Sequence, residues 1–269
     1  MVKIGVIGGT GLDADINIVK DIVKVNTSPT PFGKPSDDVV TTGKIGNVEV
    51  VIMSRHGAKH DRNPSDINYR ANIWTLKQLG CTHVLVTNAC GSLQENYKPG
   101  MIAIVDQYID RTVSRLATFH KVAHIPQAHA FNKTVQSIIA DACKSVGADY
   151  RSGACIVVVE GPRYSTLAES RLYKSWGGDI IGMTTFPEVV LAAEAGLFYN
   201  SIGLVTDYDC WHEDEGESVT VDLVMGRLKL LADVSKKILI ETITRIGKHD
   251  WTKEIEAKTQ EAKGAIMVP

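Results

Sequence analysis

Two aspartates stand where a buried strand is expected to end. Asp207 and Asp209 follow the apolar run SIGLVT at 201–206. A carboxyl group at that point is partly desolvated, and desolvation raises its pKa from about 4 toward the range of a proton donor. Both side chains share a face, because they are two positions apart on an extended chain. The pair is a candidate for general acid catalysis, with an Asx-type turn as the alternative; no histidine or third carboxylate is evidently placed to complete a metal site.

A second group of residues suits an oxyanion. Arg55 and His56 directly follow an apolar segment, and Arg offers a planar fork of donors while His adds one or two. The first predicted strand runs into Gly-Gly-Thr-Gly at 8–11, where backbone N–H groups and the Thr10 hydroxyl can hold a phosphate. The spacing does not match G-x-G-x-x-G, and no acidic residue ends a second strand about 20 positions on. This disfavours a dinucleotide site and leaves a smaller anion or a simple tight turn.

Neutral donors follow two further predicted strands. Asn88 and Ala89 come after one of them, and Thr184 comes after another. Each is a weak signal by itself, because Asn and Thr are common in turns. Ligands of open α/β sheets gather at the carboxyl ends of the strands, so the expected convergence with Arg55 is what favours a binding site.

Three loop residues carry weaker signals. Tyr164, in the turn EGPRY at 160–164, suits stacking on a flat ring as well as core packing. His60 and Arg62 are expected to be solvated. Residue type alone assigns none of them to a site.

The elements that must position these residues alternate between short apolar runs and helical patterns. The predicted strands are Ile4–Gly8, Val48–Ser54, His83–Thr87, Met101–Gln107, Ala154–Glu160, Ile180–Met183 and Ser201–Thr206. The predicted helices are Tyr69–Leu79, Lys133–Val146, Leu167–Trp176, Pro187–Ala195 and Val221–Ile246. This order predicts an α/β sandwich with a central mixed sheet flanked by helices. We expect one domain over 1–269, with 247–269 as a C-terminal tail that docks on it.

Composition excludes several classes of protein. A formal net charge of −2 over 269 residues gives no electrostatic footprint for nucleic acid or an anionic membrane. No apolar run approaches the roughly 18 residues of a membrane span. The five cysteines are widely spaced, which fits small buried hydrophobic residues in a reducing compartment. A cytoplasmic location is expected, and nuclear presence is compatible with the sequence.

Taken together, these segments resemble the trimeric purine nucleoside phosphorylase superfamily, most closely its 5′-methylthioadenosine phosphorylase branch. The resemblance runs from Lys3 to about Ile246. Its motifs are IGGTGL at 7–12, TPFGKPS at 30–36, SRHG at 54–57, NYRANIW at 68–74, ACGS at 89–92, EGPR at 160–163, MTTFPE at 183–188 and TDYDCW at 206–211. As a set they are very specific.

The resemblance implies a pentosyltransferase that cleaves a purine nucleoside with inorganic phosphate and needs no cofactor or metal. The implied phosphate-binding residues are Thr10, Arg55, His56, Asn88, Ala89 and Thr184. The implied nucleoside-binding residues are Ala89, Tyr164, Met183, Asp207 and Asp209, with an apolar 5′-methylthio pocket from Val219, Val221, Val224 and Met267, and His124 reaching in from a neighbouring subunit. A homotrimer with sites near its interfaces is part of the same expectation.

Substrate choice rests on few positions. Asp207 can accept a hydrogen bond from an exocyclic amine, and Ser165 stands where the 6-oxopurine branch has Glu; both differences favour a 6-aminopurine. Asn88 instead resembles the 6-oxopurine branch, and Gly182 replaces an Asn, so adenosine is an expected further substrate. The segment at 118–124 is also shorter than the family loop. A phosphorylase of broad or 6-oxopurine specificity and a non-catalytic nucleoside-binding protein on the same scaffold remain the alternatives.

Overall fold

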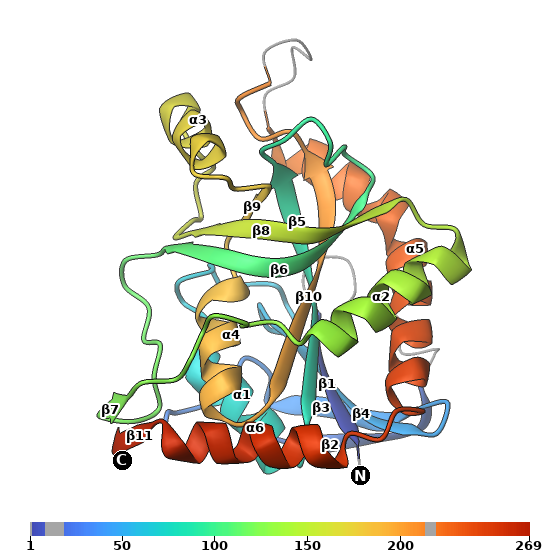
Figure 1. Cartoon of the computed structure of the whole chain (residues 1–269), viewed down its shortest axis with the longest axis vertical. Coiled ribbons are helices and arrows are strands. Elements are labelled where there is room, and N and C mark those ends of the chain that lie inside the picture. Colours follow the sequence, from blue (N-terminus) through green and yellow to red (C-terminus); the bar gives the residue numbers. More distant parts are fainter. Residues whose placement is uncertain (1, 9–18, 213–218) are drawn as a thin grey trace.

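The computed structural model describes residues 2–8, 19–212 and 219–269, and one large sheet runs through them (Figure 1). The strands are β1 (Lys3–Gly8), β2 (Lys20–Asn26), β3 (Val39–Ile45), β4 (Val48–Ser54), β5 (His83–Ser92), β6 (Ile102–Arg111), β7 (Val122–Ala123), β8 (Tyr150–Val159), β9 (Ile180–Gly182), β10 (Phe198–Asp207) and β11 (Ile266–Val268). The helices are α1 (Tyr69–Gln78), α2 (Lys133–Val146), α3 (Leu167–Ser175), α4 (Thr185–Glu194), α5 (Val221–Ile246) and α6 (Thr252–Gly264).

The sheet is mixed and partly closed. Its strand order is β10-β6-β8-β9-β5-β1-β4-β3-β2, with an additional pairing between β10 and β5. That pairing closes β10, β6, β8, β9 and β5 into a ring, while β1, β4, β3 and β2 continue as an open sheet. Strands β4, β1, β5 and β10 are parallel neighbours in that order. Their carboxyl ends therefore meet at one edge, which confirms the predicted α/β architecture.

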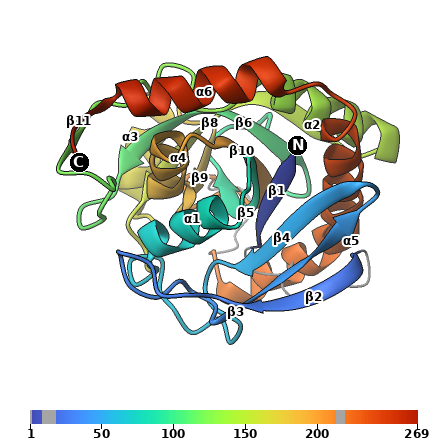
Figure 2. The ribbon, with the colours of Figure 1, turned by 90° about the horizontal axis from the view of Figure 1, so that it is seen from below.

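Helices cover both faces of the sheet (Figure 2). On one face, Ile73 and Leu76 of α1 and Val189 of α4 belong to the first core cluster. On the other, α2 packs against α5, with Val135 and Leu228 in the second cluster. These side chains are almost fully buried, and burial of apolar surface is the main favourable term in folding. Sheet and helices thus hold the strand ends rigidly in place.

Side-chain hydrogen bonds cap the starts of helices α3 and α5. The Thr166 hydroxyl accepts from the Glu169 backbone N–H, and the Glu169 carboxylate accepts from the Thr166 N–H, so α3 begins with a capping box. Thr220 caps α5 by accepting from the Leu223 N–H. These N-caps set the residue at which each helix begins.

Four strands were not predicted from the sequence. Strand β2 is almost wholly exposed at the edge of the sheet, and β3 pairs with it, so neither has the apolar run by which a buried strand is identified. The short strands β7 and β11 pair with each other in an antiparallel two-stranded sheet. This pairing joins the last residues of the chain to the segment that precedes α2.

The C-terminal segment forms helix α6 and then β11. Its sequence TKEIEAKTQEAKG is polar, and only Ala262 of the helix is buried. The helix contacts α4, and Figure 2 shows it outside the sheet. Just before it, Trp251 is buried against His83 and Phe198.

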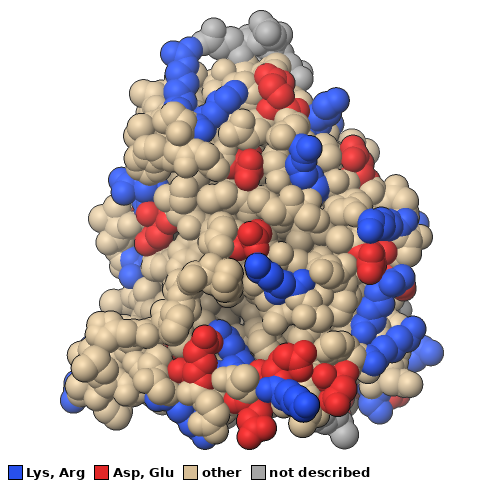
Figure 3. Space-filling view, viewed as in Figure 1, with Lys and Arg blue, Asp and Glu red and all other residues tan. Residues whose placement is uncertain are grey.

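Acidic and basic side chains are interspersed over the face drawn in Figure 3, including the region of α6 along its lower edge. The Lys258–Glu261 ion pair at 2.6 Å is one example. The described residues contain no helix long and apolar enough to span a membrane.

Candidate active site

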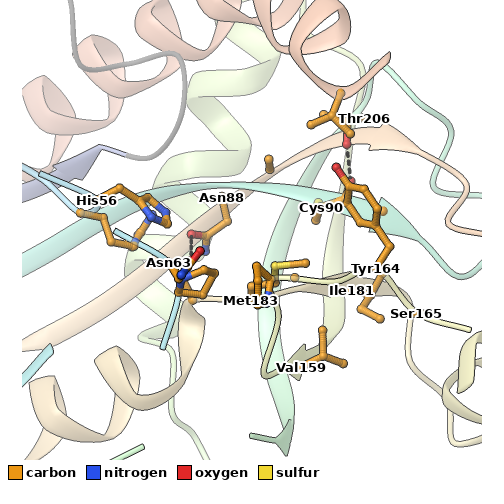
Figure 4. Close-up of a pocket in the computed structure, with 18 of the residues that line it drawn as sticks. His56, Asn63, Asn88, Cys90, Val159, Tyr164, Ser165, Ile181, Met183 and Thr206 are labelled. Atoms are coloured by element: carbon orange, nitrogen blue, oxygen red, sulfur yellow. Dashed lines mark hydrogen bonds between the residues drawn. The ribbon is translucent and has the colours of Figure 1, made fainter. Parts of the chain in front are cut away.

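A cavity of about 480 Å³ opens at the carboxyl ends of the parallel strands. The residues that the sequence predicted and that line it are Arg55, His56, Asn88, Ala89, Tyr164, Met183, Thr184, Val224, Asp207 and Asp209. In Figure 4, His56 and Asn88 lie toward one end, Tyr164 and Thr206 toward the other, and Met183 between them. Segments from β4, β5, β9, β10 and α5 therefore converge on one space, as the strand-end argument predicted.

Four predicted residues of the described ranges do not line this cavity, and a fifth is not described. Thr10 lies outside the described residues. Within the described ranges, Val219, Val221, His124 and Met267 do not line the cavity. Val221 and Met267 are 66% and 67% exposed, and the backbone N–H of His124 donates to the Ala265 carbonyl beside β11.

Arg55 is held by a buried carboxylate. Its Nε and Nη2 donate to the two oxygens of Glu188 at 2.6 and 3.1 Å, and Nη1 donates to the Thr87 carbonyl at 3.2 Å. Both side chains are at most 1% exposed. Burial lowers the pKa of the guanidinium, but the attraction of Glu188 outweighs it and the pKa rises. Arg55 therefore stays charged, and two of its five N–H groups are left for a ligand.

The sequence reasoning missed Glu188. It also accepts a hydrogen bond from the Tyr199 hydroxyl at 2.8 Å, so both of its oxygens are used. The only signal was a lone carboxylate within the apolar stretch FPEVVLA, because a charged residue in such a stretch is seldom buried without a partner.

His56 is neutral in this environment. Its Nδ1 lies 2.8 Å from the Arg62 carbonyl and so carries the proton, which leaves Nε2 as an acceptor. Burial, with smaller contributions from the charges of Arg55 and His60, lowers the pKa of His56 to about 4. A protonated phosphate oxygen is a suitable donor to such a nitrogen. His60 and Arg62, which were expected to be solvated, also line the cavity, although His60 is exposed.

The Asn88 amide is fully engaged by its neighbours. Its Nδ2 donates to Thr185 Oγ1 at 3.0 Å and to Ser201 Oγ at 2.8 Å, and its Oδ1 accepts from Thr184 Oγ1 at 3.1 Å. Asn88 thus links β5, β10 and the start of α4. In this arrangement its side chain orients Thr184 and leaves the Thr184 oxygen lone pairs as further hydrogen-bond sites.

The two aspartates lie at the end of β10, 7% and 8% exposed. Asp207 Oδ2 accepts from the Thr206 hydroxyl at 2.6 Å, and Oδ1 accepts from the Asp209 N–H at 2.8 Å. Among the ion pairs of the described part of the chain, none joins either aspartate to a cation. Burial outweighs the hydrogen bonds and raises the pKa of both carboxyl groups. These are the properties of a proton donor.

Local backbone geometry brings Asp207 into place. Asp209 has a φ of 52°, in the left-handed region that a residue other than glycine seldom adopts, and this turn directs its N–H to Asp207. A Cβ on Gly91 of the neighbouring strand would lie 2.8 Å from Asp207 Oδ1. Glycine at 91 is therefore required by the close approach of the carboxyl group.

The wall between the two ends is mostly apolar. Val159, Ile181 and Met183 line it, and Tyr164, 39% exposed, closes the side next to Asp207. A flat apolar surface beside hydrogen-bonding carboxyl groups suits a heteroaromatic ring. The described residues include no cluster of three His, Cys, Asp or Glu side chains that could hold a metal ion.

Comparison with known proteins shows the family of the chain. The family described as the Phosphorylase superfamily matches residues 3–244. S-methyl-5′-thioadenosine phosphorylase of Xenopus tropicalis is 47% identical over all of this chain and 97% of its own length, and that of Drosophila melanogaster is 45% identical over 94% and 89%.

Solved structures give the same result. Methylthioadenosine phosphorylase from Schistosoma mansoni in complex with adenine superposes with a TM-score of 0.94 at 40% identity, over 99% of both chains. A mutant of the Schistosoma mansoni adenosine/methylthioadenosine phosphorylase in complex with methylthioadenosine gives 0.92 at 39% identity, again over 99% of both. The chain therefore belongs to the phosphorylase superfamily and, within it, to the methylthioadenosine phosphorylases.

Proposed function

We propose that this protein is a pentosyltransferase that catalyses the reversible phosphorolysis of S-methyl-5′-thioadenosine to adenine and 5-methylthioribose 1-phosphate. The relatives named above carry this activity in their names, and the solved neighbours hold methylthioadenosine or adenine. One observation carries the proposal: a permanently charged guanidinium and a carboxyl group of raised pKa line the same cavity. That arrangement suits an anionic nucleophile and a leaving group that needs a proton.

Phosphate, the co-substrate, binds at the Arg55 end. The two remaining N–H groups of Arg55 and the backbone N–H of Ala89 donate to its oxygens, and the Thr184 hydroxyl does the same once its proton turns from Asn88 Oδ1 to the phosphate. The neutral His56 accepts from the protonated phosphate oxygen, and Thr10, which lies outside the described residues, is the remaining predicted ligand. A phosphate oxygen attacks the anomeric carbon while the glycosidic bond breaks and its electron pair leaves with the purine. Holding the phosphate in line supplies proximity, and its negative charge stabilises the oxocarbenium character of the sugar.

The purine binds at the Asp207 end, where Tyr164 packs near the ring and Met183 lies along the ribose. Asp207 passes its proton to N7 as the base departs, so adenine leaves as a neutral molecule and Asp207 becomes a carboxylate. The Asp209 N–H, already 2.8 Å from Asp207 Oδ1, stabilises that carboxylate. Asp207 then accepts from the 6-amino group, which is why 6-aminopurines are preferred over 6-oxopurines.

A homotrimer completes the site in this proposal. Val221 and Met267 are largely exposed in the single chain, and the β7–β11 pairing places His124 and Met267 beside one small two-stranded sheet. We expect this sheet to reach the cavity of a neighbouring copy, where His124 and Met267 join Val219, Val221 and Val224 around the methylthio group. The absence of a cofactor requirement and the cytoplasmic location stay predictions from the sequence.

The proposal is tested by incubating the purified protein with phosphate and each of methylthioadenosine, adenosine and inosine. Methylthioadenosine is expected to release adenine only when phosphate is present, adenosine to react as well, and inosine to react slowest. Rapid cleavage of inosine with inert methylthioadenosine would transfer the protein to the 6-oxopurine branch. Binding without phosphate-dependent base release would make it a nucleoside-binding protein.

A further inference from the structure

A buried arginine lies in an otherwise exposed loop next to the site. Arg115 belongs to the segment between β6 and β7, and its side chain is 1% exposed. Its loop neighbours Val113 and Leu116 are 89% and 63% exposed. A guanidinium is seldom buried to that extent unless its hydrogen bonds are needed.

The Arg115 guanidinium joins two walls of the cavity through backbone carbonyls. Nη1 donates to the carbonyls of Met183 at 2.5 Å and Phe186 at 2.6 Å, and Nη2 donates to the carbonyl of Glu160 at 2.7 Å. Met183 lines the cavity, and Glu160 directly follows Val159, which lines it too. Since hydrogen bonds from a charged donor are about twice as strong as neutral ones, this contact set fixes the distance between the two walls.

The backbone at Phe186 is shaped for this contact. Its φ of −100° and ψ of 134° lie outside the helical region although α4 has already begun. The Phe186 carbonyl therefore does not point along the helix axis and is available to Arg115. Thr184 stands between the two carbonyls that Nη1 holds, so the same two hydrogen bonds orient the turn that presents its hydroxyl.

The Glu160 carboxylate holds the loop that carries Arg115. It accepts hydrogen bonds from Ser65, from the Val113 N–H at 2.5 Å and from the Ser114 hydroxyl at 2.8 Å. Burial raises its pKa, but these hydrogen bonds outweigh that effect and lower the pKa of Glu160 to about 2. Its negative charge, 3.8 Å from Arg115 Nε, also compensates the buried cation.

We infer that Arg115 is a positioning residue, which acts by holding Met183 and Thr184 against the Val159–Glu160 wall. The inference rests on the proposed function, because it takes Met183 as a ribose contact and Thr184 as a phosphate ligand. Lysine cannot replace Arg115: an ammonium is a point charge on a flexible stem and lacks the planar fork that reaches both walls at once. The Asp207 end receives no contact from Arg115, so binding of the free base is independent of it.

The test compares Arg115→Ala and Arg115→Lys with the unchanged protein in methylthioadenosine phosphorolysis, and measures kcat, the phosphate KM and the dissociation constant of adenine. Displacing reactive groups by about 1 Å costs on the order of 100-fold in rate, and we expect a loss of that size in kcat/KM for phosphate in both variants. Adenine binding is expected to change less than about twofold. Added guanidinium at millimolar concentration should restore part of the activity of Arg115→Ala, because it fills the space of the lost group.

Arg245→Lys is the matched control, since Arg245 pairs with Glu241 on α5, away from the cavity, and it should behave as the unchanged protein. The inference is overturned if both Arg115 variants keep the phosphate KM and kcat, if adenine binding falls as much as phosphate use, or if guanidinium restores nothing. If Arg115→Ala fails to fold, Arg115→Lys alone tests the inference, through its kcat, its phosphate KM and its dissociation constant for adenine. If the protein without substitutions releases no adenine from methylthioadenosine, the proposed function is contradicted, and this outcome does not depend on Arg115.

Discussion

The two ends of the cavity are buried to a similar degree but treat charge in opposite ways. At the Arg55 end, Glu188 pairs with the guanidinium through two hydrogen bonds, and the positive charge is fixed. At the Asp207 end, two carboxyl groups lie side by side, Asp207 accepts hydrogen bonds from the Thr206 hydroxyl and the Asp209 backbone N–H, and the pKa values of both carboxyl groups rise. Burial with a counterion keeps a charge, whereas burial without an ion-pair partner raises the pKa of a carboxyl group and so favours its protonated form.

This difference assigns the two substrates. A guanidinium that cannot lose its charge suits an anion, and a carboxyl group of raised pKa suits a leaving base that needs a proton. One desolvated cavity contains both kinds of group, because the counterion Glu188 comes from α4 and pairs with the guanidinium at the Arg55 end. Substitutions that change or remove the charged or acidic group at either end of the cavity therefore test this difference.

The largest effect is expected at the Asp207 end of the cavity. Asp207→Asn keeps the shape of the side chain but has no acidic proton, so kcat/KM for methylthioadenosine should fall by about 10²–10⁴-fold. The new amide donates to a 6-oxo group, and the ratio of inosine to methylthioadenosine cleavage should rise. Steady-state kinetics on both nucleosides measures this; Asp141→Asn, at an exposed site on α2, is the control. An unchanged ratio would remove Asp207 from substrate selection.

Removing the counterion at the other end should lower stability. Glu188→Gln leaves the buried Arg55 charge uncompensated, which costs about 3–5 kcal/mol of unfolding free energy. Urea denaturation measures the loss. Glu241→Gln breaks the more exposed pair with Arg245 and should cost at most about 1 kcal/mol. Equal losses in the two variants would show that Glu188 is not a counterion that Arg55 needs.

A smaller effect is expected from crowding the Asp207 carboxyl. Gly91→Ala puts a methyl group 2.8 Å from Oδ1, and such overpacking costs about 1–3 kcal/mol; the activity on methylthioadenosine should fall with it. Gly226→Ala on α5 meets no atom within 4 Å and should be neutral or stabilising by up to about 1 kcal/mol. Thermal unfolding of the two variants compares them. A fully active Gly91→Ala protein would contradict the close approach that the structure shows.

The smallest effect concerns pH. His56 has a pKa lowered to about 4, against about 6.5 in the unfolded chain. The unfolded state therefore binds more protons in this range, so this contribution to stability is present above pH 6.5 and is lost as the pH falls toward 4. His56→Gln should lose less stability over the same range, measured by urea denaturation at several pH values. Parallel curves for the two proteins would mean that the pKa of His56 is the same in the folded and unfolded chain.

The sequence predicted the framework of the site because that framework depends on local patterns. Apolar runs marked β4, β5 and β10, and the residues that follow parallel strands meet at one edge, which is why Arg55 and Asp207 were predicted to lie in one site. Strand β9 was also marked by its apolar run, but it is antiparallel to β5, and Thr184 reaches the cavity because β9 pairs with the last residues of β5. The β2–β3 pair was not predicted, because β2 faces solvent and lacks an apolar run.

The sequence did not predict which residues form hydrogen bonds with the site residues. Arg55 and Glu188 are 133 positions apart, and Arg115 and Met183 are 68 apart. The family resemblance implied that Asn88 binds phosphate, yet its amide forms hydrogen bonds with Thr184, Thr185 and Ser201. Such pairings depend on how the helices pack on the sheet, and neither the periodicity nor the spacing of residues in the sequence predicts that packing.

The claim that one cavity receives phosphate at Arg55 and the purine at Asp207 is tested most directly by a crystal structure with phosphate and adenine bound. We expect phosphate oxygens within hydrogen-bond distance of the Arg55 guanidinium and the Thr184 hydroxyl, and N7 of adenine within the same distance of the Asp207 carboxyl group. Phosphate bound away from Arg55, or adenine with N7 turned from Asp207, would contradict the account.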